Sequence, residues 1–341
     1  MRFSALPVIE GDSFLLDEDG KYILVDGGRR RAKIVKLLDS ECIPNKHINI
    51  IICTHYDSDH IDGIIDILDS RKYTFDELWL PEVLASLSYT LSEKLREILD
   101  YLRRQEDVVD NFEIDSLSDL PYTENIESIN EKQKKHLINF VKKCNRIEFR
   151  KEKYSEELNN IFSALSMVSS AIKSCSKVRW FTFTNNLEDF QCGNDMVSKN
   201  AIETGITIYS TPKIFFNALS LTVKNKESLV YLYDNDNLPN VLFTADSDLS
   251  FTKFPIKLKK NSIVTTPHHG SDANKKAYSK ISGENIYYVR SDKKQIKRPC
   301  AEYLLLPNRF CTICRDKIPH KKVVIECVNG ITNTLSKKCI C

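Results

Sequence analysis

The stretch that decides the fold is Thr54-His55-Tyr56-Asp57-Ser58-Asp59-His60, which directly follows the apolar run 48–53. The run has the composition of a buried strand, with Ile at four of its six positions. Polar groups are costly to bury unless something pairs with them. Four donor side chains within six residues at the end of a strand lie on the rim of a sheet, where they can point at one centre. The pattern therefore predicts a metal site, with Asp59 and His60 at the start of the following helix.

Three further predicted strands end in a possible ligand. Asp26 follows the apolar run 22–25 and precedes Gly27-Gly28, and Asp246 closely follows the apolar residues 241–243. The pair His268-His269 follows the strand predicted at 262–265. Any one of these residues has an ordinary interpretation as a capping Asp or a surface His. Together they indicate one metal centre on one edge of a sheet.

The chain divides into three zones of different texture. Residues 1–81 alternate short apolar runs with turn residues, and helices are predicted at 32–38 and 61–68, which points to an α/β layered domain. Residues 82–177 carry apolar side chains at helical spacing and predict a helical insertion, which either covers the core or shapes a substrate channel. Residues 178–341 return to strands, including one predicted at 206–209, and complete the core.

Several motifs, taken in order, resemble a known family. His55-x-Asp57-x-Asp59-His60 resembles the His-x-His-x-Asp-His signature of metallo-β-lactamase fold hydrolases, with Asp in place of the second His. Together with Pro267-His268-His269-Gly270-Ser271, it is similar to the soluble hydrolase domain of ComEC-type competence proteins and their stand-alone relatives. The supporting motifs are Gly11-Asp12-Ser13-Phe14-Leu15-Leu16, Val25-Asp26-Gly27-Gly28, Leu78-Trp79-Leu80-Pro81, Asn225-x-x-Ser228-Leu229 and Leu242-Phe243-Thr244-Ala245-Asp246.

The resemblance implies a four-layer αββα sandwich that carries up to two divalent metal ions, zinc or manganese. His55 and Asp57 would hold one ion, and Asp59 and His60 the second. Asp246 would bridge the two ions. His268 or His269 would complete the set, and the resemblance does not decide between them. Asp26 would support the site by accepting a hydrogen bond from a ligand.

The sequence departs from the family pattern at three points. Asp62 stands where the family usually has Gly, and Ala245 stands where Gly precedes the bridging Asp. A third His present in many members is missing, because no His lies between His136 and His268. The first metal site is therefore expected to be short of ligands.

The expected activity is metal-dependent hydrolysis, most simply of a phosphodiester in single-stranded nucleic acid or a small nucleotide. Asp59 would orient the attacking water, His269 would stabilise charge or protonate the leaving oxygen, and Ser271 would hold a phosphate oxygen. Two alternatives stay open: hydrolysis of an ester, lactone or thioester, or a catalytically weak member that binds a nucleotide or partner. The insertion 82–177 is a possible docking segment for a protein partner, for example in a bacterial defence complex.

Charge and composition restrict the partners and the compartment. The chain has 341 residues with 49 basic and 47 acidic side chains, a net charge of +2, so the footprint of a dedicated DNA-binding domain is absent. Local basic runs at 29–33 and 293–298 are the candidate nucleic-acid contacts. There is no stretch of about 20 apolar residues and no apolar leader after Met1. We therefore expect no membrane association and a cytoplasmic location.

Cysteine usage allows a second metal site near the C-terminus. The eleven cysteines are an odd number, which suggests reduced thiols and not a disulfide framework. Cys311-x-x-Cys314 has zinc-like spacing, and Cys339-Ile340-Cys341 could add two thiolates. A structural zinc site at Cys311 and Cys314 is thus one possibility, and reduced cysteines on strands are the other.

Overall fold

The computed structural model describes thirteen parts of the chain. They are residues 1–29, 33–84, 163, 166–168, 170–171, 174, 177–185, 189–204, 227–292, 298–313, 321–328, 330–339 and 341. Most of the predicted insertion 82–177 lies outside these residues, as do the strand predicted at 206–209, the basic residues 30–31 and 293–297, and Cys314.

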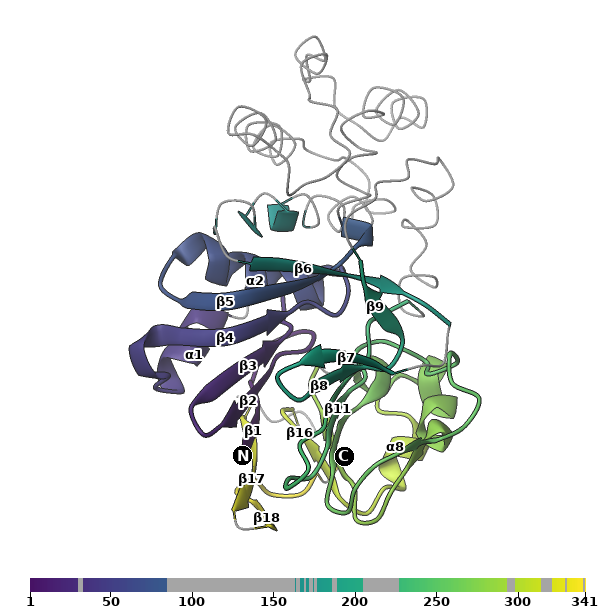
Figure 1. Cartoon of the computed structure of the whole chain (residues 1–341). Coiled ribbons are helices and arrows are strands. Elements are labelled where there is room, and N and C mark those ends of the chain that lie inside the picture. The colour runs from purple at the N-terminus through teal and green to yellow at the C-terminus, as the bar shows by residue number, and fades with distance from the viewer. Residues whose placement is uncertain are drawn as a thin grey trace, which may run out of the picture.

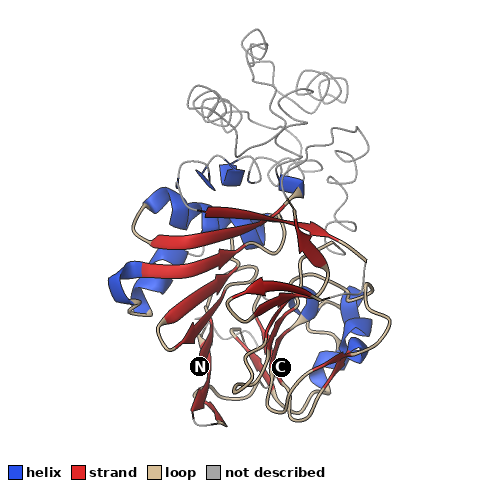
Figure 2. Ribbon diagram, viewed as in Figure 1, coloured by secondary structure: helices blue, strands red, loops and turns tan. Residues whose placement is uncertain are grey.

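Two sheets face each other and form the centre of the molecule (Figures 1 and 2). The first has nine strands in the order β18-β17-β1-β2-β3-β4-β5-β6-β9. Its strands are β1 (Arg2–Ala5), β2 (Phe14–Glu18), β3 (Lys21–Val25), β4 (His47–Ile52), β5 (Thr74–Pro81), β6 (Lys177–Phe183), β9 (Ala201–Glu203), β17 (Val323–Val328) and β18 (Ile331–Thr334). Strands β3 to β6 run parallel, so their carboxyl ends meet at one edge.

The second sheet has seven strands in the order β16-β15-β13-β11-β10-β8-β7. Its strands are β7 (Phe190–Gly193), β8 (Met196–Ser198), β10 (Tyr231–Tyr233), β11 (Val241–Phe243), β13 (Ile263–Thr265), β15 (Tyr287–Arg290) and β16 (Arg309–Cys311). Strands β11, β13, β15 and β16 are parallel. A two-stranded sheet, β12 (Ile256–Lys257) with β14 (Ile281–Ser282), completes the strands of the described residues.

Side chains from both sheets fill the space between them. Phe3, Phe14 and Trp79 of the first sheet pack in one buried cluster with Tyr231 and Phe243 of the second. On its other face the second sheet packs residues such as Leu242 and Val264 against Tyr278 and Tyr303 of neighbouring helices. The alternation of strand residues between two buried faces explains the nearly continuous apolar runs in the sequence.

Helices cover the outer faces of both sheets. α1 (Ile34–Ser40) and α2 (Ser58–Ser70) lie on the nine-stranded sheet, while η6 (Asp272–Lys280) and α8 (Ala301–Leu304) pack on the seven-stranded sheet (Figure 1). Two short helices, η2 (Pro44–Lys46) and η5 (Pro267–Gly270), precede β4 and follow β13, respectively. This arrangement confirms the predicted four-layer αββα sandwich. None of the helices in the described ranges has the length and hydropathy needed to cross a membrane.

Helix α2 begins three residues earlier than the apolar pattern indicated. Asp57 has an extended backbone and precedes the first turn, and Arg71 in the left-handed region ends the helix. Asp59 and His60 therefore lie in the first turn, as the sequence predicted. The early start follows from the backbone hydrogen bonds of His60 and Ile61 to the Asp57 carbonyl.

Two glycines let α2 approach the loop after β3. A Cβ on Gly63 would lie 1.9 Å from the Gly27 carbonyl oxygen, and a Cβ on Gly27 would lie 2.3 Å from the Ile64 nitrogen. Neither position can accept a side chain, so this close approach requires glycine on both sides. It is reinforced by the hydrogen bond from the Gly27 N–H to the His60 carbonyl, which brings Asp26 beside α2.

Asp62, which stands where the family usually has Gly, contacts the described end of the predicted insertion. The Ser163 hydroxyl donates to Asp62 at 2.6 Å, and the Ser170 hydroxyl donates to Asp69 at 2.7 Å. Met167 and Val168 are helical and fully buried. Asp62 therefore holds the described end of this segment against α2, while the glycine contact of the helix is made by its neighbour Gly63.

Candidate metal centre

The possible ligands come from the carboxyl ends of strands in both sheets. Asp26 and His55 follow β3 and β4 of the nine-stranded sheet, while Asp246 and His268 follow β11 and β13 of the seven-stranded sheet. The sequence had suggested one edge of a single sheet. The structure corrects this, because the cluster lies where two sheets meet.

Each of the four histidines has an oxygen atom next to its Nδ1. The Nδ1 of His60 lies 2.8 Å from Asp26 Oδ2, and that of His269 lies 3.0 Å from Asp12 Oδ1. The remaining two partners are Asn274 Oδ1, 3.3 Å from His268 Nδ1, and Thr54 Oγ1, 3.2 Å from His55 Nδ1. An oxygen acceptor at Nδ1 favours the tautomer that leaves the Nε2 lone pair available to a metal.

The four Nε2 atoms surround the carboxylate of Asp246. Its Oδ1 lies 3.5 Å from His60 Nε2 and 3.3 Å from His269 Nε2. Its Oδ2 lies 3.3 Å from His268 Nε2 and 3.8 Å from His55 Nε2. Each carboxylate oxygen thus faces a different pair of histidines, which is the arrangement of a bridging ligand.

Asp57 and Asp59 add one carboxylate to each half of the cluster. A half is one oxygen of Asp246 with the pair of histidines that it faces. Asp57 Oδ2 lies 4.0 Å from His55 Nε2, and Asp59 Oδ2 lies 3.5 Å from His269 Nε2. Donor atoms that share one tetrahedral ion at about 2.0–2.2 Å lie about 3.3–3.6 Å apart. The distances from Asp246 to His60, His268 and His269 have this spacing, whereas those of 3.8 and 4.0 Å to His55 Nε2 are longer.

Buried atoms without partners supply a direct test of whether these residues fit a metal. The Nε2 atoms of His55, His60 and His269 and the Oδ1 of Asp246 are buried, and no hydrogen bond satisfies them among the described residues. An unsatisfied buried polar atom costs about 1–3 kcal/mol. Four such atoms gathered around the Asp246 carboxylate fit bound divalent cations, which would satisfy them.

In the ion-free protein, burial and neighbouring charges shift the pKa values of the cluster's histidines in opposite directions. Burial disfavours the charged form of His60, but the Asp26 carboxylate outweighs this and raises its pKa well above the usual value. Burial is likewise outweighed at His269, where Asp12 and Asp246 raise the pKa. Burial and the neighbouring charge of His60 lower the pKa of His55 to about 3.

Asp59 is the most accessible carboxylate of the cluster. Its side chain is 25% exposed, whereas that of Asp246 is 4% exposed. Burial raises the pKa of Asp59, but the neighbouring imidazole of His269 and the charge of His60 outweigh it, so the net pKa is lowered. Asp59 is therefore an ionised carboxylate within reach of a substrate.

Asp12 is a site residue that the sequence interpretation missed. It is buried, and its second oxygen has no hydrogen-bond partner in the described part of the chain. A Cβ on Gly11 would lie 1.7 Å from the Asp59 carbonyl oxygen, so this glycine allows Asp12 to approach α2. The available signal was Gly11-Asp12-Ser13, which by itself indicates only a family motif. Asp12 holds His269 as Asp26 holds His60.

Ser271 and Ala245 are two further residues that the sequence singled out. Ser271 caps a helix in the structure, where the sequence had suggested a phosphate contact. The Ser271 hydroxyl oxygen accepts a hydrogen bond from the Ala273 N–H and so caps η6. Ala245, in the place of a family glycine, has φ of 47°, which is the left-handed region that glycine favours. Ala245 thus adopts a backbone conformation that favours glycine, in spite of its side chain.

An arginine pair lies beside the cluster and was only partly anticipated. The buried Arg290 donates from Nε to the His269 carbonyl at 2.8 Å. Arg298, the last residue of the basic run 293–298, donates to Asp292 Oδ2 at 2.9 Å. Burial opposes the charge of Arg298, but Asp292, with smaller contributions from Asp246 and Asp59, raises its pKa. A permanent positive charge therefore lies near the carboxylates of the cluster.

Comparison with known proteins supports the class defined by this fold and site. Residues 6–74 match the family model described as the metallo-beta-lactamase superfamily. This match agrees with the resemblance in the sequence over this N-terminal part of the chain. The more specific resemblance to ComEC-type domains stays a prediction. A search of the curated proteins finds no match.

Solved structures with a similar arrangement have low sequence identity. The metallo-β-lactamase fold protein YhfI from Bacillus subtilis is 10% identical, with a TM-score of 0.34 over 91% of this chain and 96% of that chain. The short form of human tRNase Z is 9% identical, with a TM-score of 0.36 over 95% and 98% of the two chains. Zinc-bound PqqB from Methylobacterium extorquens is 7% identical, with a TM-score of 0.33 over 83% and 78%.

Proposed function

We propose that the chain is a metal-dependent phosphodiesterase that cleaves single-stranded nucleic acid or a small nucleotide at the His–Asp cluster. The observation that carries the proposal is the Asp246 carboxylate, whose two oxygens face two different histidine pairs. A pair of divalent cations supplies Lewis acidity and can hold both the attacking and the leaving oxygen of a phosphate.

The donor set divides into two groups around Asp246. His55, Asp57 and His268 with Asp246 Oδ2 would hold one ion. Asp59, His60 and His269 with Asp246 Oδ1 would hold the other. In this arrangement both neighbouring histidines are ligands, and His268 supplies the donor that the first site lacked in the sequence. A mixture of imidazole nitrogen and carboxylate oxygen suits Zn²⁺ or Mn²⁺.

The chain's own residues would then perform two tasks. The ionised and partly exposed Asp59 orients the attacking water and accepts its proton. Arg298, held by Asp292, places positive charge beside a non-bridging phosphate oxygen, and guanidinium groups bind phosphate well. This positive charge favours a phosphodiester over a neutral ester or lactone.

The test compares two substrates and two variants. Metal-loaded protein is assayed with bis-nitrophenyl phosphate and with nitrophenyl acetate, and a labelled single-stranded oligonucleotide follows. We expect faster cleavage of the diester, competitive inhibition by inorganic phosphate, and a loss of at least about 100-fold in Asp59→Asn. Arg298→Gln should raise KM for the diester more than it lowers kcat. Preferential cleavage of the acetate, unaffected by phosphate, would refute the proposal.

Residues 82–177 are proposed to cap the substrate or to dock a protein partner. The described end of this segment packs on α2, the helix that carries Asp59 and His60. Photo-crosslinking of the full chain to a bound oligonucleotide distinguishes the two roles. Crosslinked peptides from 82–177 support a cap, and crosslinks confined to the core refute it.

A further inference from the structure

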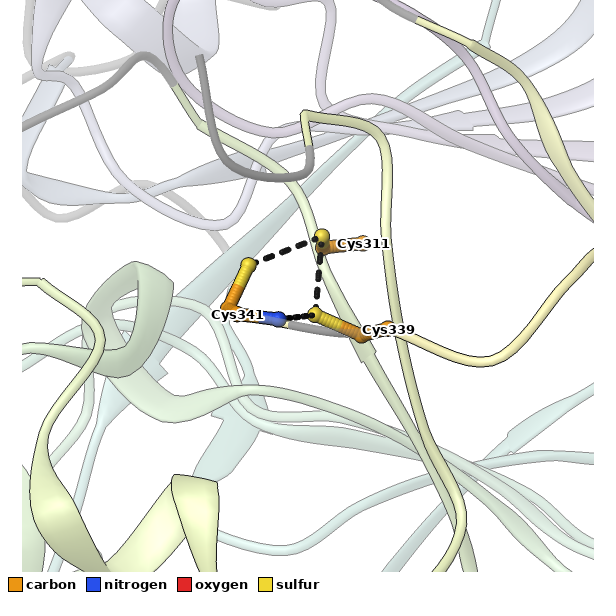
Figure 3. A group of neighbouring side chains, drawn as sticks. All are labelled: Cys311, Cys339 and Cys341. Atoms are coloured by element: carbon orange, nitrogen blue, oxygen red, sulfur yellow. Dashed lines mark hydrogen bonds between the residues drawn. The ribbon is translucent and has the colours of Figure 1, made fainter. Parts of the chain in front are cut away.

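Three cysteines outside the His–Asp cluster gather at the edge of the second sheet (Figure 3). Cys311 ends β16, and Cys339 and Cys341 lie in the segment that follows β18. The sulfur of Cys311 is 3.2 Å from that of Cys339 and 3.6 Å from that of Cys341. Cys339 and Cys341, which follow Cys311 by 28 and 30 positions, thus bring their thiols next to its thiol.

The sulfur spacing fits a shared metal ion better than a disulfide. Three thiolates on a tetrahedral zinc ion, at Zn–S distances of about 2.3 Å, have sulfurs about 3.8 Å apart. A disulfide requires about 2.05 Å. The observed distances of 3.2 and 3.6 Å are much closer to the first value.

The surroundings of the three sulfurs are those of an enclosed site. Cys311 and Cys339 are buried and pack with Tyr303 in the apolar cluster on the outer face of the second sheet, and Cys341 packs against that cluster. The Cys311 thiol contacts the Ile313 carbonyl at 2.8 Å. Three thiols that crowd together in an apolar environment gain little from their weak mutual hydrogen bonds.

A half-buried positive charge lies on the same strand face. Arg309 is two residues before Cys311 in β16, so both side chains lie on one face of the strand. Its NH1 donates to the Leu306 carbonyl, while its Nε is buried without a hydrogen-bond partner in the described part of the chain. Three thiolates and one Zn²⁺ have a net charge of −1, which a guanidinium nearby would offset.

The position of the cluster also gives it a structural role. β17 and β18 belong to the nine-stranded sheet, while β16 is the edge strand of the seven-stranded sheet. The segment after β18 returns to β16 through the hydrogen bond from the Cys339 N–H to the Arg309 carbonyl at 2.7 Å. A metal held by all three sulfurs would link the edges of the two sheets.

We infer that Cys311, Cys339 and Cys341 bind one Zn²⁺ ion as thiolates, in a site separate from the His–Asp cluster. Thiolates are soft ligands that select zinc over the harder divalent metals. Binding would release thiol protons to solvent and would stabilise the folded chain. This inference is independent of the proposed phosphodiesterase activity.

Cobalt substitution of the full-length protein tests the site without relying on activity. The reduced protein is freed of metal with a chelator and titrated with Co²⁺, and its near-ultraviolet absorption is recorded. Thiolate ligation gives a sulfur-to-cobalt charge-transfer band that imidazole and carboxylate ligands do not give. We expect this band in the wild type, with a final amplitude that corresponds to one thiolate-bound Co²⁺ per chain, and its displacement by added Zn²⁺.

Single substitutions assign the band to the three sulfurs. Cys311→Ser, Cys339→Ser and Cys341→Ser should each weaken it, whereas Cys327→Ser, a buried cysteine of β17 outside the cluster, should leave it unchanged. Absence of the band in the folded wild type would overturn the inference even if every variant failed to fold. Loss of two titratable thiols from the eleven in the denatured, non-reduced protein would overturn it in favour of a disulfide.

Discussion

The His–Asp cluster and the three-cysteine cluster are both built from ends of strands in the two sheets, but they hold their donors differently. In the His–Asp cluster every imidazole has an oxygen partner at Nδ1, so each Nε2 is aimed before any ion binds. In the cysteine cluster the sulfurs contact one another and the Ile313 carbonyl. The first cluster is therefore pre-organised by neighbouring residues, whereas the second depends on an ion for its geometry.

The largest expected effect comes from removing the residue common to both halves of the His–Asp cluster. Asp246→Ala should abolish binding of both ions and lower diester hydrolysis by at least about 100-fold, because it leaves four imidazoles without their central carboxylate. Metal content by mass spectrometry and initial rates measure both effects. Asp248→Asn, two residues along, is the matched control and should keep both properties. A cobalt–thiolate band that disappears in Asp246→Ala would show that the two clusters are coupled.

The second largest effect on metal binding is expected from changing Asp12 or Asp26, the two carboxylates that orient ligating histidines. Asp12→Asn and Asp26→Asn should each weaken metal binding by about 10–100-fold, as is typical for partners of ligating histidines. Asp26 also accepts hydrogen bonds from the Thr54 N–H and hydroxyl, so its substitution should lower the free energy of unfolding more than that of Asp12. Competition with a fluorescent chelator and chemical denaturation give the two quantities. Equal affinity of the wild type and Asp12→Asn would show that Asp12 does not support His269.

The pH dependence of metal binding should reflect the raised pKa values of His60 and His269. Each Nε2 must lose its proton to bind an ion, so loading near pH 7 should release protons from both, and affinity should fall as pH falls. Calorimetry in two buffers of different ionisation enthalpy counts the protons, and Asp26→Asn should release fewer. Metal binding at pH 7 without proton release would contradict the raised pKa values of His60 and His269.

The same shifts predict how the ion-free protein responds to pH. Because both folded pKa values exceed the unfolded value of about 6.5, the ion pairs with Asp26 and Asp12 contribute stability that is fully present below that pH. This contribution is lost as pH rises through the folded pKa values. Thermal melts of the ion-free protein across this range measure it, and Asp12→Asn should flatten the profile.

The smallest effect is expected at Ser271, which the sequence interpretation placed in the catalytic machinery. Its observed contact is a cap on η6, so Ser271→Ala should lower the free energy of unfolding by about 1 kcal/mol and slow turnover by less than about threefold. Ser279→Ala, on the same helix, is the control. Turnover slowed by about two orders of magnitude with unchanged stability would return Ser271 to a catalytic role.

The local patterns were sufficient for the layers and for most of the candidate ligands. The apolar run 48–53 and the following donors could only form a strand that ends at a polar rim, and β4 and α2 have this form. The short strands β7, β8 and β16 were not predicted, since each has only three or four residues and little alternation. Their existence depends on pairing with neighbouring strands and not on their own sequences.

What the sequence determined by itself was the chemistry of the donors: imidazoles and carboxylates placed directly after strands, and two pairs of cysteines near the C-terminus. What only the tertiary structure decided was which donors share a centre. It placed Asp12 behind His269, put both His268 and His269 on Asp246, and joined Cys311 to Cys339 and Cys341. The physical reason is that such contacts join residues between 22 and 257 positions apart, and the packing of strands and sheets sets those distances, whereas local sequence does not.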